Sequence, residues 1–152
     1  MLLGLHHTAI STPDIKQAIH FYCDILGGTQ ASDIQHWGPN DEIPDRMLQL
    51  DNSCGVFVHI KVGNAYLEIF QFKGPEPKSI DRRACDYGLP HLCFVVDDLD
   101  SDYQTWKKAG MIFHAEPAVF SDGSKFVYGR DFDGNIIELL EIPECASTPN
   151  IP

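Results

Sequence analysis

Two stretches of the chain carry a histidine within a short run of apolar and β-branched residues. Residues 5–11 (Leu-His-His-Thr-Ala-Ile-Ser) and 91–96 (His-Leu-Cys-Phe-Val-Val) have the composition and length of buried strands. Apolar residues at helical spacing follow each run, over 15–26 and 98–109, and glycine stands directly after both segments. We therefore predict two strands that each lead into an amphipathic helix, with a histidine on each strand.

The positions that follow these two histidines match each other. Seven residues after His7 and after His91 stands an aspartate, and fifteen residues after them stands an aromatic residue. Each copy then closes with a strand that carries a glutamate between apolar neighbours, Glu68 in the first copy and Glu138 in the second. The chain is therefore two diverged copies of one unit, each opening with a strand histidine and closing with a strand glutamate.

The expected elements give each copy the order strand, helix and three strands (βαβββ). The later strands span 29–36, 56–62 and 65–72 in the first copy, and 111–115, 124–130 and 136–142 in the second. We predict an α+β fold in which the strands of both modules curl into an open, β-barrel-like cavity. The chain of 152 residues fits one domain, with module one over 5–72, a linker over 73–90, module two over 91–142 and a tail over 143–152. The irregular stretch 37–52 is interpreted as a surface excursion or a functional lid.

Two turns set which residues face each other across the expected sheets. A two-residue Gly-Asn turn places His59 directly across from Glu68, and a five-residue turn places Tyr128 across from Glu138. Directly opposed residues share one face of a sheet. His59 and Tyr128 are therefore candidates for the same cavity as the two glutamates, with packing inside a sheet as the alternative for both.

An excess of acidic side chains excludes two classes of partner. The chain has 22 Asp and Glu against 11 Lys and Arg, which gives a formal net charge of −11. A nucleic-acid binder needs a basic face to neutralise phosphates, and the same requirement applies to an anionic membrane surface. We expect no nucleic acid and no membrane as partner, which leaves a small molecule.

The cysteines indicate a reducing compartment. Five cysteines are scattered without a Cys-x-x-Cys pair, which argues against a disulfide framework and against a zinc finger. Cys23 and Cys93 fall inside the first helix and the second histidine strand, where a reduced thiol serves as a small core residue. No cationic, apolar leader stands before residue 5, and no apolar run approaches the roughly 18 residues of a membrane span. We expect a cytoplasmic protein.

Two histidines and two glutamates that face one cavity point to a bound metal ion. Buried carboxylates without a positive partner are costly, because an ionised group in an apolar site shifts its pKa or takes a counter-charge. One divalent cation ligated by His7, Glu68, His91 and Glu138 removes that cost. Two imidazoles and two carboxylates suit a six-coordinate Ni, Co, Mn, Fe or Zn ion that keeps positions open for water or substrate.

Several short motifs surround these four residues. They are His7-Thr8-Ala9-Ile10, Asp14 with Phe21-Tyr22, Leu67-Glu68-Ile69, His91 with Val96-Asp97-Asp98-Leu99, and above all Arg130-Asp131-Phe132-Asp133-Gly134-Asn135-Ile136-Ile137-Glu138-Leu139. In these motifs, over about residues 5–142, the chain resembles the vicinal oxygen chelate superfamily, which includes glyoxalase I, methylmalonyl-CoA epimerase, extradiol dioxygenases and the fosfomycin and bleomycin resistance proteins. The last motif is similar to the superfamily's R-D-P-D-G-N-x-x-E-L, with Phe132 in place of the proline. The resemblance implies the same four metal ligands.

Within that superfamily the chain resembles glyoxalase I and methylmalonyl-CoA epimerase most. A His/Glu/His/Glu ligand set looks like glyoxalase I, since the epimerase usually has glutamine at the position of Glu68. Ser11 and Phe72, however, stand where glyoxalase I holds glutathione with arginine and asparagine, which argues against the lactoylglutathione reaction. Extradiol dioxygenases have a tyrosine ten residues before the last ligand, where Tyr128 stands, but their further upstream histidine is missing. Resistance proteins that only bind their ligand typically lack the metal ligands.

These observations predict a metal-dependent isomerase, epimerase or lyase of the glyoxalase-like type. It moves a proton next to a carbonyl of a small substrate with two vicinal oxygens. Glu138 or Glu68 removes the proton, and His59 or Tyr128 delivers it to the other face. The alternatives are an Fe(II)-dependent extradiol-type dioxygenase and a non-catalytic, resistance-type protein that binds a small molecule. A homodimer is expected, with the site closing within one chain or between two.

Overall fold

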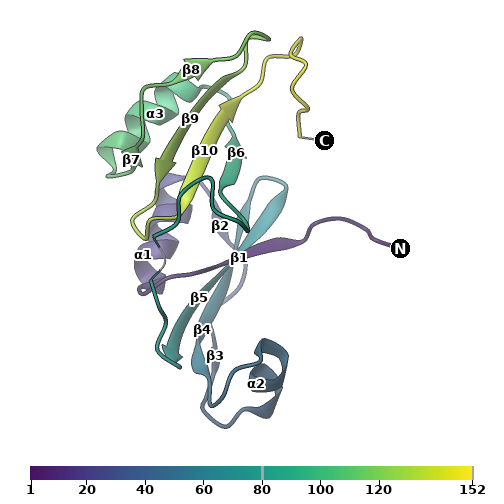
Figure 1. Cartoon of the computed structure of the whole chain (residues 1–152), viewed down its shortest axis with the longest axis vertical. Helices are drawn as coiled ribbons and strands as arrows, with labels where there is room; N and C mark the ends of the chain where they lie inside the picture. Colours follow the sequence, from purple (N-terminus) through teal and green to yellow (C-terminus); the bar gives the residue numbers. More distant parts are fainter. Residues whose placement is uncertain (80, 152) are drawn as a thin grey trace. The chain divides into compact units, whose positions relative to one another are not determined.

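The computed structural model describes residues 1–79 and 81–151, and the chain divides into two units, residues 1–79 and 80–152. Unit 1 contains β1 (His7–Ser11), α1 (Ile15–Ile19), the π-helical η1 (His20–Ile25), β2 (Thr29–Gln30), β3 (Gln35–Trp37), α2 (Glu42–Leu48), β4 (Cys54–Val62) and β5 (Ala65–Gly74). Unit 2 contains β6 (Leu92–Val95), α3 (Leu99–Lys108), β7 (Ile112–Phe113), β8 (Ala118–Val119), β9 (Lys125–Arg130) and β10 (Ile136–Glu141). Figure 1 labels the strands and the helices α1, α2 and α3 along the chain. No helix in the described part is long and apolar enough to cross a membrane.

Both units have one five-stranded sheet with the same strand order. Unit 1 runs β1-β5-β4-β2, with β3 also on β4, and unit 2 runs β6-β10-β9-β7, with β8 also on β9. The first strand of each unit pairs in parallel with the last strand, and the other pairs are antiparallel. The mixed α+β architecture with two repeated units is as predicted. The predicted barrel-like cavity is corrected to two open sheets, because the end strands of each sheet, β1 and β2 in unit 1 and β6 and β7 in unit 2, do not pair with each other.

The pairing register confirms the internal repeat. Glu68 stands opposite Ala9 on β1, and Glu138 stands opposite Cys93 on β6. In both units the glutamate is thus aligned with the residue two positions after the strand histidine. The two copies match in three dimensions as well as in sequence spacing.

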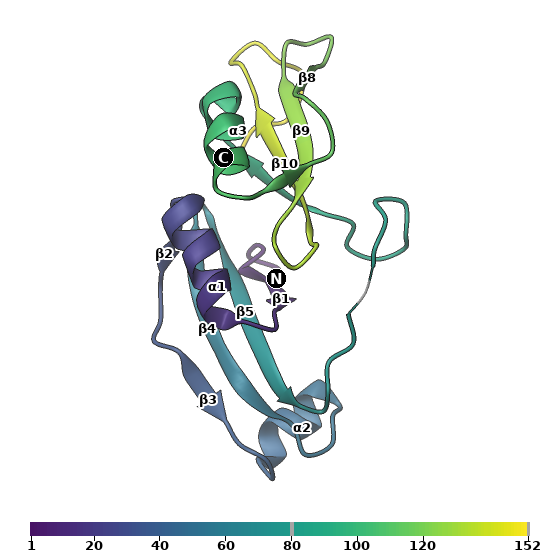
Figure 2. The same cartoon turned by 90° about the vertical axis from the view of Figure 1, so that its left-hand side faces the viewer.

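One face of each sheet is covered by the helix that follows the first strand. In unit 1, α1 and η1 lie over β4 and β5 (Figure 2), where Val58, Ile60 and Ile69 are fully buried. In unit 2, α3 contacts β10, and Ile137 and Leu139 are fully buried. Because strand residues alternate between faces, the uncovered face of each sheet carries the intervening positions, which are mostly half-buried in β4 and β5, whereas Glu138 on β10 is buried. Those positions include the candidate site residues.

Two of the expected elements are wrong in detail. The strand predicted over 29–36 is split into β2 and β3, because the backbone turns out of the ladder at Ser32, whose hydroxyl accepts from the His59 N–H. The stretch 37–52 is not wholly irregular, since it contains α2. That helix buries no side chain, and its seven residues are fewer than the window over which helical periodicity is recognised. Asp45 holds it to the strand that follows, by accepting from the N–H groups of Asn52 and Ser53 at 2.8 and 2.7 Å.

The indole of Trp37 lies directly over Gly55. A Cβ added at Gly55 would come within 2.5 Å of Trp37 Cη2 and within 2.5 Å of the Gln71 carbonyl oxygen. The ring is fixed there by its N–H, which donates to Ser53 Oγ at 3.0 Å. Glycine at this position is therefore required by a close approach of a ring to the backbone.

We expect Gly55→Ala to lower the free energy of unfolding by about 1–3 kcal/mol, because the methyl group overpacks this contact. Urea unfolding would show this as a lower midpoint at unchanged slope. Gly38→Ala is the matched control, since a Cβ there meets nothing within 4 Å. Equal midpoints for the two variants would contradict the description of this contact.

Candidate functional site

In unit 1, the parallel pairing of β1 with β5 brings a histidine and a glutamate together. His7 Nε2 lies 3.2 Å from Glu68 Oε2, and the glutamate side chain is only 16% exposed. His59 lies on β4, directly across from Glu68 as predicted, with its Nε2 3.3 Å from Glu68 Oε1. One carboxylate therefore has an imidazole at each of its two oxygens.

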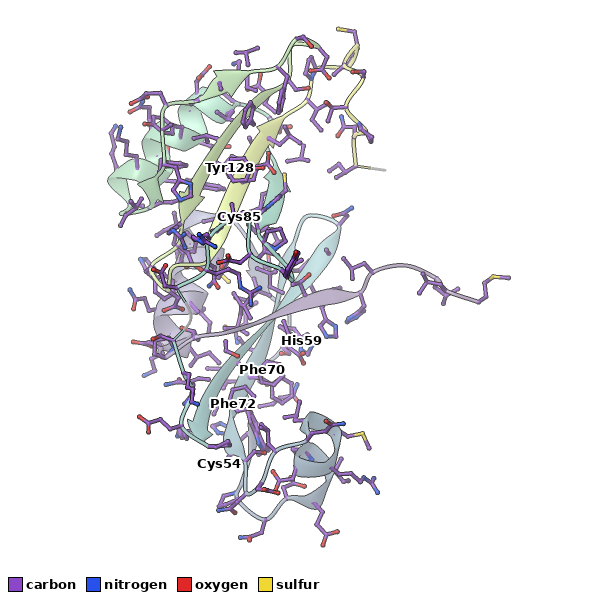
Figure 3. The ribbon with its side chains drawn as sticks, in the orientation of Figure 1. Cys54, His59, Phe70, Phe72, Cys85 and Tyr128 are labelled. Atoms are coloured by element: carbon purple, nitrogen blue, oxygen red, sulfur yellow. The ribbon has the colours of Figure 1, made fainter. Side chains whose placement is uncertain are left out.

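Unit 2 repeats this arrangement. His91 Nε2 lies 3.1 Å from Glu138 Oε2, and the glutamate side chain is 11% exposed. Tyr128 lies directly across from Glu138 on β9, as predicted, and its ring meets the His91 ring edge-on with centroids 5.3 Å apart. Figure 3 labels His59 and Tyr128, the equivalent residues of the two units. Each unit thus combines a histidine, a glutamate and one further side chain that can carry a proton.

The four predicted ligands lie as two pairs, one in each unit. The nitrogen–oxygen distances of 3.2 and 3.1 Å suit two ligands of one ion, because ligands bound at about 2.1 Å and at right angles lie about 3 Å apart. Imidazole and carboxylate are also donors that first-row divalent metals accept. Within residues 1–79 and 81–151, no group of three or more His, Cys, Asp or Glu is arranged to hold a metal ion.

Tyr128 and Cys93 both keep their protons at neutral pH. Burial, and after it the neighbouring Glu138 carboxylate, raise the pKa of Tyr128 to about 12. The same two causes raise the pKa of the Cys93 thiol to about 12, since the residue keeps contact with solvent but the protein around its sulfur desolvates the thiolate. Tyr128 is therefore suited to donate a proton and not to accept one.

Two residues near the pairs escaped the sequence analysis. Cys93 is not the core residue we expected: it is exposed and stands opposite Glu138, because its strand turns this position to the uncovered face. The sequence could have predicted this position of Cys93, because residues two apart on a strand share a face and Cys93 is two residues from His91. His6 precedes β1, and strand alternation would place it away from His7. Its Nδ1 instead lies 2.8 Å from His7 Nδ1, which can fix the orientation of the His7 ring.

The Arg-Asp-Phe-Asp-Gly-Asn motif builds the turn before Glu138 and does not enter the histidine–glutamate pair. The buried Asp131 carboxylate accepts from the backbone N–H groups of Asp133 and Asn135 at 3.0 and 2.8 Å. Arg130 donates to the Arg82 carbonyl oxygen at 2.8 Å, and Arg82 donates to the Leu89 carbonyl oxygen at 3.1 Å. These contacts tie the segment that leads into His91 to the end of β9.

Comparisons with known proteins identify the family of the chain. The family model described as the Glyoxalase/Bleomycin resistance protein/Dioxygenase superfamily matches residues 4–139. The chain is 25% identical to a 2-epi-5-epi-valiolone epimerase from Actinomyces sp., over 95% of this chain and 82% of that protein. It is 26% identical to an ethylmalonyl-CoA/methylmalonyl-CoA epimerase from Cereibacter sphaeroides, over 93% of this chain and 100% of that protein.

The fold also occurs among solved structures. A glyoxalase family protein from Bacillus cereus superposes with a TM-score of 0.84 at 21% identity, over 93% of this chain and 95% of that one. The family match covers nearly the whole chain, including the strands that carry all four histidine and glutamate residues of the two pairs. The chain belongs to the Glyoxalase/Bleomycin resistance protein/Dioxygenase superfamily.

Proposed function

We propose that this protein is a metal-dependent epimerase, isomerase or lyase that moves a proton next to a carbonyl group. The observation that carries the proposal is the repeated group of a histidine, a glutamate and an opposed proton carrier in each unit. The two epimerase relatives support this class of reaction. The substrate class is a small molecule with two neighbouring oxygens.

The metal ligands of this proposal are His7 and Glu68 from unit 1 and His91 and Glu138 from unit 2. The support is the spacing within each pair and the chemistry of the donors. A divalent cation held there would supply positive charge to the oxygens of an enediolate, which lowers the barrier to removal of the neighbouring proton. We propose a homodimer as the working form, with both pairs of a site from one chain or from two.

Side chains of this protein accept and donate the protons in the proposed reaction. A glutamate, Glu138 or Glu68, accepts the proton from carbon. His59 faces the Glu68 oxygen that points away from His7, so it can exchange a proton with that carboxylate. Tyr128 stays protonated because its pKa is about 12, and it serves as a donor to the opposite face of the intermediate.

The metal content of the protein tests the proposed ligands. Equilibrium dialysis followed by elemental analysis should find about one divalent ion per chain. His7→Ala or Glu138→Ala should weaken binding by more than the 10–100-fold that is typical for loss of a group that only orients a ligand. His20→Ala is the matched control, since His20 is an exposed histidine that contacts Asp24 at 2.7 Å. Failure to bind any of Ni, Co, Mn, Fe and Zn after refolding would remove the enzyme proposal.

Exchange of a substrate α-proton with solvent deuterium tests the proposed reaction. Among 2-oxo acids, acyl-CoA thioesters and ketosugars in D₂O, one should exchange its α-proton only when metal is present. In samples saturated with metal, Glu138→Gln should abolish exchange, because an amide oxygen can still bind the ion but cannot accept the proton. His59→Ala should slow exchange by about 10²–10⁴-fold and leave the metal bound, which separates a proton-transfer role from a ligand role.

His36→Ala is the matched control for His59→Ala, since His36 is an exposed histidine of β3 in the same sheet. The hemithioacetal of methylglyoxal and glutathione is the negative substrate control. Oxygen consumption with a catechol, with no α-proton exchange in any substrate class, would replace this proposal with ring-cleaving dioxygenation.

A further inference from the structure

Four aromatic side chains extend from the unit 1 pair along the uncovered face of the sheet. Phe57 stands two residues before His59 on β4, and Phe70 and Phe72 stand two and four residues after Glu68 on β5. Strand alternation places all of them on the same face as the pair. Trp37 completes the group from β3, and we call these four residues the aromatic cluster. Figure 3 shows His59, Phe70 and Phe72 following one another along the sheet.

The cluster begins in contact with His59 and continues without interruption. The His59 and Phe57 ring centroids are 5.9 Å apart, edge to face. Phe57 stacks on Phe70, and Phe70 stacks on Phe72, each with centroids 5.5 Å apart. Trp37 closes the far end, with its centroid 5.2 Å from that of Phe72. A ligand placed at Glu68 and His59 therefore has an aromatic surface directly beside it.

The cluster is rigid but incompletely covered within its unit. Trp37 is 9% exposed and is held by Ser53 and by its close approach to Gly55. The three phenylalanines are only half-buried, whereas Val56, Val58 and Ile69 on the helix-covered face are buried. A contiguous apolar surface beside a few convergent polar groups is typical of a small-molecule site.

The charged residues on the uncovered face of the unit 1 sheet lie outside the aromatic cluster. On β4, the face that carries Phe57 and His59 continues to Lys61, which is exposed and lies on the far side of His59 from the cluster. The face is therefore apolar at one end, carries the histidine and glutamate in the middle and is cationic at the other end. A substrate with one apolar end matches this order.

We infer that the substrate carries an aryl or similarly flat apolar group, which lies on the aromatic cluster while its two oxygens face Glu68 and His59. The inference rests on the proposed function and adds the substrate class to it. Offset and edge-to-face contacts between rings are favourable beyond the burial of area, so an aryl group is favoured over a methyl group at this position.

Two hydroxamates test the metal site and the aryl-binding surface separately. Both present two neighbouring oxygens to a metal, and they differ only in the attached group. Acetohydroxamate tests for a metal with open positions, and benzohydroxamate adds the ring. For the Zn-loaded protein, calorimetry should show benzohydroxamate binding about tenfold or more tighter than acetohydroxamate. In a Trp106→Phe background, benzohydroxamate should also change the fluorescence of Trp37, which is then the only tryptophan.

Phe70→Leu removes a ring and keeps an apolar side chain. It should reduce the preference for benzohydroxamate to about twofold and leave the affinity for acetohydroxamate unchanged. Phe57→Leu should act in the same direction and serves if Phe70→Leu fails to fold. Phe113→Leu is the matched control, because Phe113 packs on Tyr103 in unit 2 with centroids 4.6 Å apart and should keep the full preference.

The outcomes distinguish the inference from the function on which it rests. If acetohydroxamate binds and benzohydroxamate is no better, the metal site stands and the aryl inference is overturned. If Phe70→Leu keeps the preference but turns a dimer into a monomer in sedimentation, the cluster is an interface between copies and the inference is again overturned. If neither hydroxamate binds the Zn-loaded protein, the proposed function fails and the inference fails with it.

Discussion

The placement of two carboxylates on largely buried sheet positions is the constraint on which the rest of this structure depends. Glu68 and Glu138 are 16% and 11% exposed at the side chain, and an ionised carboxylate in such a place requires hydrogen-bond donors or positive charge nearby. The parallel pairing of the first and last strand in each unit meets this requirement by setting a histidine within 3.2 or 3.1 Å. The antiparallel neighbours of β5 and β10 then place His59 opposite Glu68 and Tyr128 opposite Glu138.

Because side chains alternate between the two faces of a strand, each sheet has one face that packs under a helix and one face that can hold polar groups. The face covered by a helix holds the fully buried aliphatic residues that stabilise the unit, such as Val58 and Ile69. The other face is spared from core packing, so it can hold polar groups beside aromatic rings. In unit 1 this face passes from the paired imidazoles and carboxylate to the phenylalanines within a few residues, which separates the reacting end of a ligand from its apolar end.

The sequence was most informative where short turns and the repeat determine position. A two-residue turn leaves one register for β4 and β5, so the opposition of His59 and Glu68 followed from counting residues, as did that of Tyr128 and Glu138. The helix α2 was missed because it has only seven residues and includes Pro44, and the position of His6 depends on where β1 begins. The open, barrel-like cavity was predicted from an expected curl of the strands, and side-chain alternation does not specify that curl.

The central proposal is that one ion takes an imidazole from each unit, His7 from the first and His91 from the second, within one chain or between two. X-ray absorption at the zinc edge of the Zn-loaded protein tests this most directly, because it counts imidazole ligands and detects sulfur. We expect two imidazoles with oxygen ligands and no sulfur, and a fall to one imidazole in His91→Ala. Two imidazoles retained in His91→Ala would place the ion on His7 and His59 of unit 1 alone, and a sulfur ligand would implicate Cys93; either result would contradict the claim.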